Sequence, residues 1–265
     1  MLLFDKYLVL DLLSNKEETK IYLVDNVLNN NQYIIKALYK NVLKDYMQKQ
    51  YYKEIDLLGK VRHSRIPKIH EVINVNDWIY IVIDYIKGVS LERYALEENV
   101  NEEEALTLFK SLIDIVDYLH TSFDRPVIHR DIKPSNVICY NHDLYLIDFG
   151  NVRYYNQSKN KDTIKLGTKG FAAPEQYDDA SQTDERTDIY GMGITMYYLL
   201  TKHNPAEPPY EIYPIRYFSK EYSEDLEKII TKCIKLNPEE RYQSCSDLLN
   251  DIKLLVRSEN NGTRC

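Results

Sequence analysis

Glycine is scarce in this chain of 265 residues, which contains eight glycines and none before Gly59. Glycine allows a backbone to approach phosphate groups closely and to adopt positive φ angles. The absence of glycine therefore excludes a glycine-rich phosphate-binding loop from the N-terminal part of the chain. A phosphate ligand bound there would meet side chains instead of bare backbone.

Cysteine is also scarce, and its spacing argues against a zinc site or a disulfide framework. The chain has no CxxC pair and no other ligand spacing. Reduced, structural thiols are the expected state, which suits a reducing cytoplasm. The four cysteines are Cys139, Cys233, Cys245 and Cys265.

Long apolar runs are absent as well. The longest, residues 190–200, contains glycines and is far too short to cross a bilayer. Asp5 and Lys6 interrupt the apolar N-terminal stretch, so no signal peptide is predicted. We therefore expect a cytoplasmic protein without a membrane span. The net charge of −7 argues against general binding to nucleic acid or to anionic membranes.

What is present is typical of a globular protein large enough for one big domain or two lobes. Alternating apolar residues predict strands, and one segment with helical periodicity interrupts them. A short connector is expected near residues 85–88. The predicted strands cover residues 7–13, 20–25, 32–38, 69–75 and 78–84, and the predicted helix covers residues 41–60.

The remaining chain is predicted to be mostly helical. Asn101 is a good N-cap, and Glu104 three residues later completes the pattern of a capping box. Ser223 begins another predicted helix, a final one covers residues 246–256, and short strands are expected near residues 137–139 and 144–147. The fold class is thus α+β. A small β-rich lobe of about residues 1–85 precedes a larger, mainly helical lobe of about residues 89–258, and residues 259–265 form a C-terminal tail.

The most informative motif is the run from His129 to Asn136, followed by Asp148-Phe149-Gly150. Phosphoryl transfer requires that the phosphates and the acceptor are held in line and that their charge is neutralised. A carboxylate and an amide oxygen, from Asp148 and Asn136, are suitable ligands for Mg²⁺. Asp131 can orient a hydroxyl proton, and Lys133 can reach a transferred phosphate as a point charge.

These motifs resemble the catalytic loop and the metal-binding triplet of eukaryotic-type protein kinases. The similarity covers about residues 5–256. In it, Lys36 matches the lysine that holds the phosphates, and Glu54 matches its ion-pair partner. Three further matches occur in the family's order: Ala173-Pro174-Glu175 at the end of the activation segment, Asp188 as the helix aspartate that braces the catalytic loop, and Arg241 as the partner of Glu175.

The resemblance implies a bilobal fold and transfer of the γ-phosphate of ATP to serine or threonine of protein substrates. Lys133, two residues after Asp131, is what the serine/threonine-directed members carry, and residues 171–176 are similar to bacterial members. Mg²⁺ is expected on Asn136 and Asp148, with Mn²⁺ as an alternative. Catalysis is expected from Asp131, Lys133 and Asn136, and nucleotide contacts from Leu13, Ile21, Ile34, Lys36, Glu54, Ile83, Asp84, Ile86, Ile138 and Asp148.

Arg130 beside Asp131 resembles kinases that are controlled by phosphorylation of the activation segment. A phosphate there would pair with Arg130 and order the segment. Ser158 and Thr163 are the candidate acceptors. Thr168 occupies the position at which the family uses a threonine to position the substrate, and it is a weaker candidate for modification.

One part of the pattern departs from the family. The three glycines of the family's nucleotide loop fall on Ser14, Lys16 and Thr19, and isoleucine replaces a small alanine at Ile34. The charged residues expected for catalysis are nevertheless all present. This favours an active kinase with weakened nucleotide affinity, or one that needs an activating partner or a dimer to order the loop. A pseudokinase that regulates by protein contact is the alternative, and a small-molecule kinase is less favoured.

Overall fold

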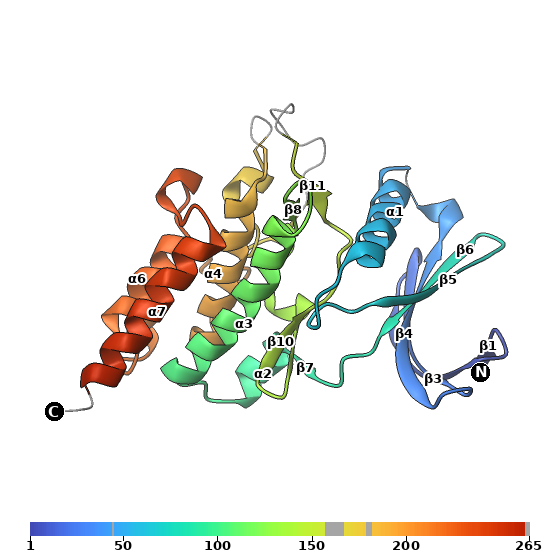
Figure 1. Ribbon diagram of the computed structural model, residues 1–265, viewed down its shortest axis with the longest axis horizontal. Helices are drawn as coiled ribbons and strands as arrows, with labels where there is room; N and C mark the ends of the chain where they lie inside the picture. Colours follow the sequence, from blue (N-terminus) through green and yellow to red (C-terminus); the bar gives the residue numbers. More distant parts are fainter. Residues whose placement is uncertain (44, 157–166, 179–181, 263–265) are drawn as a thin grey trace. The chain divides into compact units, whose positions relative to one another are not determined.

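A computed structural model describes residues 1–43, 45–156, 167–178 and 182–262. The chain divides into two compact units, Met1–Lys87 and Gly88–Cys265. The division falls within the connector that the sequence predicted. The first unit is a sheet with one long helix, and the second is mainly helical (Figure 1). The predicted α+β fold class is confirmed.

The first unit is built on a six-stranded antiparallel sheet in the order β1-β2-β3-β4-β6-β5. The predicted bounds of β5 and β6 are correct, whereas β2, β3 and β4 extend one or two residues beyond the prediction. The strands are β1 Leu2–Leu3, β2 Tyr7–Asn15, β3 Thr19–Asn26, β4 Asn31–Tyr39, β5 Ile69–Val75 and β6 Trp78–Asp84.

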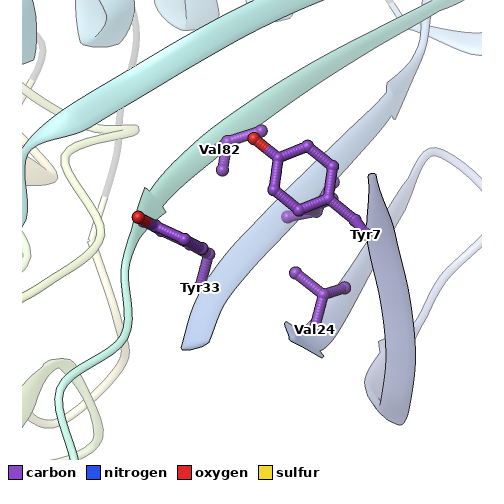
Figure 2. Packing of buried hydrophobic residues seen from close by; sticks show 5 residues of the cluster. Tyr7, Val24, Tyr33 and Val82 are labelled. Atoms are coloured by element: carbon purple, nitrogen blue, oxygen red, sulfur yellow. The ribbon is translucent and has the colours of Figure 1, made fainter. Parts of the chain in front are cut away.

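One face of this sheet buries a core formed by Tyr7, Val24, Tyr33, Ile35 and Val82 (Figure 2). The start of the chain also reaches the opposite edge of the sheet. The Lys6 ammonium and the Tyr7 hydroxyl each donate to Glu71 of β5 over 2.8 Å. The rings of Phe4 and Tyr80 meet edge to face at 4.8 Å. The sheet is therefore curled, with its first strands closing toward β5.

The other face of the sheet is covered by α1, Asp45–Lys60. The prediction of one helix from residue 41 was wrong at its start, because a separate 3-10 turn, η1 Lys40–Val42, precedes α1. This turn brings Leu43 into the core beside Leu38, Ile79 and Ile81. The Gln48 side chain then donates to the carbonyls of Lys40 and Leu43, which compensates for the break in helical hydrogen bonding.

The second unit begins with a close approach of two backbones. A Cβ at Gly88 would lie 2.3 Å from the Cys139 carbonyl oxygen, so only glycine fits there. A three-stranded sheet follows, in the order β10-β9-β7, and a two-stranded sheet pairs β11 with β8. The strands are β7 Val89–Ser90, β8 Val127–Ile128, β9 Val137–Tyr140, β10 Asp143–Leu146 and β11 Arg153–Tyr154.

Helix α4 is the centre of the second unit. It is buried on all sides from Thr187 to Leu200, as expected of a helix that is apolar around its whole circumference. Helices α2, α3 and α6 pack against it (Figure 1). The helices are α2 Leu91–Glu97, α3 Glu102–Thr121, α4 Glu185–Thr201, α5 Ile215–Phe218, α6 Glu224–Cys233 and α7 Cys245–Gly262, and the 3-10 turns are η2 Pro134–Asn136, η3 Pro174–Gln176 and η4 Pro238–Glu240.

The predicted helix caps are confirmed in part. Asn101 accepts from the Glu104 amide at 2.9 Å, and Ser223 accepts from the Leu226 amide at 3.1 Å. The capping box is not completed, because the Glu104 carboxylate accepts from the Tyr94 hydroxyl instead. Helix α7 continues beyond the predicted end at residue 256. Among the described residues, no helix is both long enough and apolar enough to cross a membrane.

Candidate active site

Lys36 and Glu54 form a largely buried ion pair within the first unit. The Lys36 ammonium lies 3.0 and 2.9 Å from the two Glu54 carboxylate oxygens, and the side chains are 13% and 6% exposed. Alternation along β4 turns Lys36 toward the face that α1 covers, opposite to its buried neighbour Ile35. A strand residue and a helix residue 18 positions apart are thus brought together as the sequence predicted.

Three predicted nucleotide contacts lie on the same face as Lys36. Ile21 is the cross-strand partner of Lys36, and Ile34, two residues before Lys36, is the partner of Ile83. All three side chains are partly buried. An apolar surface beside the lysine is therefore formed by one residue from each of three adjacent strands.

The other predicted nucleotide contacts of this unit are Leu13, Asp84 and Ile86, which lie outside this apolar surface beside Lys36. Leu13 lies in a bulge of β2, between Leu12 and Ser14, and its side chain is 52% exposed. The Asp84 carboxylate accepts from the Lys68 amide at 2.9 Å and lies 2.5 Å from His70 Nε2. Ile86 lies in the connector and is partly buried. The Asp84 carboxylate thus already has two partners within this unit.

The hairpin between β2 and β3 closes without glycine. The Lys16 amide donates to the Thr19 carbonyl at 2.9 Å, and Ser14 pairs with Ile21. Ser14, Lys16 and Thr19 all avoid positive φ angles. The turn is thus compatible with ordinary residues, and the three substitutions carry no backbone strain. Glu17 stands exposed at its tip.

In the second unit, Asp188 of α4 holds the segment that contains the predicted catalytic residues. Its two carboxylate oxygens accept from the backbone amides of His129 and Arg130, both at 2.8 Å. Arg130 has a φ of 67°, a left-handed conformation that a side chain rarely adopts without support. The buried carboxylate, 1% exposed, supplies that support and confirms the bracing role expected from the sequence.

Asp131, Lys133 and Thr168 form one hydrogen-bonded group. The Thr168 hydroxyl donates to Asp131 Oδ1 at 2.8 Å and accepts from the Lys133 ammonium at 2.7 Å. Lys133 also donates to Asp131 Oδ2 at 3.0 Å. One hydroxyl group thus lies between a carboxylate and an ammonium, within hydrogen-bond reach of a group that can accept its proton.

The donor set of Asn136 and Asp148 fits Mg²⁺. Asn136 donates through Nδ2 to the Asp131 carbonyl and to Asp131 Oδ2, at 2.9 and 3.1 Å, which turns its amide oxygen elsewhere. The Ile147 amide donates to the Asn136 carbonyl at 2.9 Å, so Asp148 follows directly on a residue bonded to Asn136. Asp148 is exposed, with a φ of 63°. One carboxylate and one amide leave positions for water and phosphate oxygens, as this ion prefers.

Two further predicted residues are placed in this unit. Ile138 is the second residue of β9, which follows η2 directly, and is partly buried. Arg241 and Glu175 form the predicted ion pair: NH1 and NH2 of Arg241 lie 2.8 and 2.9 Å from the two Glu175 oxygens. The side chains are 0% and 8% exposed. This bidentate pair confirms the expectation of a buried contact between the end of the activation segment and the segment after α6.

Comparisons with known proteins agree with this geometry. The sequence profile described as "Protein kinase domain" matches residues 16–252. The chain belongs to the protein kinase domain family.

Several curated relatives of this kinase domain are kinases by name. It is 32% identical to serine/threonine-protein kinase D of Synechocystis sp., over 82% of this chain and 44% of that protein. It is 28% identical to CBL-interacting protein kinase 10 of Oryza sativa subsp. japonica, over 94% of this chain and 57% of that protein. It is 29% identical to CBL-interacting serine/threonine-protein kinase 12 of Arabidopsis thaliana, over 91% of this chain and 51% of that protein. The kinase domain thus spans about half the length of these relatives.

Two residues around the catalytic loop of the kinase domain were missed by the sequence analysis. His120 of α3 lies 2.9 Å from Asp188 Oδ2, and its other ring nitrogen lies 3.7 Å from Cys245 Sγ. Gln176 donates to the Arg130 carbonyl at 2.8 Å and accepts from the Ala173 amide. Both are buried and support the backbone around Arg130 and Asp131. No local pattern marks these roles, because Asp188 lies 68 positions from His120 and Arg130 lies 46 positions from Gln176.

His129 is a packing residue, as the sequence analysis expected. It is fully buried, its ring meets Phe149 edge to face at 5.0 Å, and its Nδ1 accepts from the Asp131 amide at 3.3 Å. Burial lowers the pKa of its imidazole below the ordinary value of 6.5. The ring has no access to solvent and its Nδ1 is occupied by the Asp131 amide, so it is not placed to act as the base for an acceptor hydroxyl.

The lowered pKa of His129 predicts a loss of stability in mild acid. Below pH 6.5 the His129 imidazole binds a proton in the unfolded chain but not in the folded chain, so the free energy of unfolding falls as the pH falls. The slope from one such group is at most about 1.4 kcal/mol per pH unit. Urea unfolding between pH 7.5 and 5.5 measures it. A His129→Phe variant should show a shallower decline than the wild type, and equal slopes would contradict the prediction.

Arg130 is held away from solvent. It is 7% exposed, and its Nε donates to the Asn151 carbonyl at 2.8 Å. Burial, with repulsion from Arg153 as a smaller cause, lowers the pKa of its guanidinium to about 10. Two neighbouring cations form a suitable environment for an anion. Ser158 and Thr163 lie outside the described residues, and Thr168 is engaged with Asp131 and Lys133.

Proposed function

We propose that this kinase domain transfers the γ-phosphate of ATP to serine or threonine hydroxyls of protein substrates. The observation that carries the proposal is the contact of one hydroxyl, that of Thr168, with both Asp131 and Lys133. A substrate hydroxyl would make the same kind of contact, with Asp131 to orient its proton and Lys133 to stabilise the migrating negative charge. The names of the relatives, which include serine/threonine kinases, support the same assignment.

The nucleotide is proposed to bind through charged groups and an apolar surface beside them. Lys36, kept in place by Glu54, holds the phosphates, and Ile21, Ile34 and Ile83 supply apolar contacts near them. Asn136 and Asp148 are the residues that would hold Mg²⁺. When bound, this ion neutralises the phosphate oxygens and keeps them in line for transfer. Mn²⁺ suits the same donors.

Incubation with γ-labelled ATP and Mg²⁺ tests the proposal. Myelin basic protein serves as a generic acceptor, and hydrolysis of the product identifies the labelled amino acid. The wild type should label serine or threonine, whereas Asp148→Asn should label neither, because one metal ligand is lost. Labelled tyrosine alone, or equal labelling by both proteins, would count against the assignment.

Autophosphorylation is the regulatory part of the proposal. A phosphate on the segment that contains Ser158 and Thr163 would find Arg130 and Arg153 as counter-charges, and would order that segment by ion pairing. Mass spectrometry of the labelled kinase should locate phosphate between residues 151 and 168. Phosphate found exclusively elsewhere would refute this part and leave the transfer reaction intact.

A pseudokinase that works by protein contact is the second candidate, and the β2–β3 hairpin favours it. Its side chains at Ser14, Lys16 and Thr19 replace the open backbone that glycine would give, and Glu17 adds a charge that repels phosphate. Thermal unfolding with and without Mg²⁺ and ATP separates the two candidates. Ligand at a hundred times its Kd should add about 2.7 kcal/mol of stability. No added stability would favour the pseudokinase.

A further inference from the structure

Tyr51 connects three parts of the first unit. It lies on α1 three residues before Glu54, so both side chains leave the same face of the helix. Its ring lies beneath the Lys36 ammonium, 5.0 Å from nitrogen to ring centroid. Its hydroxyl lies 3.2 Å from the Thr19 hydroxyl at the start of β3. Lys36 is therefore approached from α1 by a carboxylate and by an aromatic face.

The contact with Thr19 concerns the position where the nucleotide loop of the family has its last glycine. Thr19 is 8% exposed, and its side chain lies on the face of β3 that also carries Ile21. A glycine there could not make this hydrogen bond. The residue that replaces glycine therefore joins the base of the β2–β3 hairpin to the helix that carries Glu54. The hydrogen bond thus fixes the hairpin to α1, whereas a glycine at this position would leave the hairpin without this link.

We propose that Tyr51 is a positioning residue for the nucleotide phosphates, acting through Thr19 and Lys36. Its hydroxyl holds the hairpin, and its ring restricts the Lys36 ammonium by a cation–π contact. A hairpin that cannot bring bare backbone to the phosphates is instead kept at a fixed position relative to Lys36. The inference rests on the proposed binding of ATP, because the phosphates are what this arrangement would position.

Two conservative variants isolate the hydrogen bond. Tyr51→Phe keeps the ring beneath Lys36 and removes one hydroxyl, and Thr19→Val removes the other while preserving shape. The loss of one hydrogen bond corresponds to about a 2- to 12-fold change in an equilibrium constant. Each variant should weaken binding of a fluorescent ATP analogue by that factor. The double variant should be no weaker than either single one, because the two hydroxyls form a single contact.

Steady-state kinetics distinguishes positioning from general destabilisation. In both variants the KM for ATP should rise while kcat stays within about twofold of the wild type. Tyr51→Leu also removes the ring that restricts Lys36, so kcat should fall as well. The matched control is Tyr52→Phe, since Tyr52 is the next residue of α1 and is 54% exposed. That control should change neither parameter.

Hydrogen exchange without nucleotide provides a readout that does not depend on catalysis. Amides of residues 12–20 should exchange faster in Tyr51→Phe than in the wild type or in Tyr52→Phe. If the wild type binds ATP but Tyr51→Phe changes neither affinity nor exchange, the role of Tyr51 is refuted and the proposed kinase function stands. Additive effects of the two hydroxyl variants would also refute it. Failure of the wild type to bind ATP would overturn both proposals.

Discussion

Replacement of Asp131 by asparagine should lower the rate of phosphate transfer by about 10²- to 10⁴-fold. Oδ1 of this carboxylate accepts from Thr168, and Oδ2 accepts from Lys133 and Asn136. An amide keeps the volume but loses the proton acceptor. It also sets an N–H group against one of three donors that already surround the carboxylate. The variant should therefore both slow the chemical step and displace Lys133.

The measurement is kcat with saturating ATP and myelin basic protein, with thermal unfolding as a check of folding. The matched control is Asp225→Asn, because Asp225 is an exposed carboxylate of the same unit, paired with Lys228 at 2.8 Å. That change should leave kcat within about twofold, as expected of a surface ion pair. A folded Asp131→Asn protein that retained more than a tenth of the wild-type kcat would contradict the assignment.

Arg241→Ala should lower the free energy of unfolding by about 3–5 kcal/mol, because it leaves the Glu175 carboxylate buried and uncompensated. Arg241 makes five hydrogen bonds: two to Glu175 and three to the carbonyls of Lys235, Leu236 and Arg186. The variant therefore removes the donor from three backbone carbonyls and from the Glu175 carboxylate. Glu175 loses both of its bonds to the guanidinium and keeps that from the Thr187 hydroxyl.

Urea unfolding of the purified kinase domain measures this cost. The matched control is Arg93→Ala, since Arg93 pairs with Glu97 on the surface, with side chains 67% and 51% exposed. It should cost no more than about 0.5 kcal/mol. A double variant, Arg241→Met with Glu175→Leu, should recover part of the loss, because it removes both charges. A cost below about 1 kcal/mol for Arg241→Ala would show that the pair is not buried in solution.

Local patterns predicted the elements well wherever the elements are set by local chemistry. The strands β5 and β6 flank an Asn-Asp turn, so both their bounds could be predicted. The start of α1 could not, because η1 is fixed by the burial of Leu43 against strands that lie far along the chain. Glu104 illustrates the same limit. Its spacing from Asn101 fits a capping box, but Tyr94 competes for its carboxylate.

The candidate site divides in the same way. Asp131, Lys133, Asn136 and Asp148 lie in compact motifs whose spacing carries the chemistry. The residues that hold these groups in place do not lie in such motifs. His120 contacts Asp188, which lies 68 positions away in the sequence, and Tyr51 contacts Thr19, which lies 32 positions away. Such pairs are set by how α1, α3 and α4 pack, and periodicity gives no sign of which buried histidine or tyrosine will be used. A sequence motif thus identifies reacting groups better than the residues that hold them.

The profile that identifies the family begins at residue 16, after β2 has ended. Phe4, Lys6 and Tyr7 precede that point, yet they tie the outer strands to Tyr80 and Glu71. A recombinant fragment cut to the limits of the profile would leave β3 as a bare sheet edge and would uncover the apolar surface beside Tyr33. Anyone who expresses the domain for the assays above should retain the opening residues, since their removal invites aggregation.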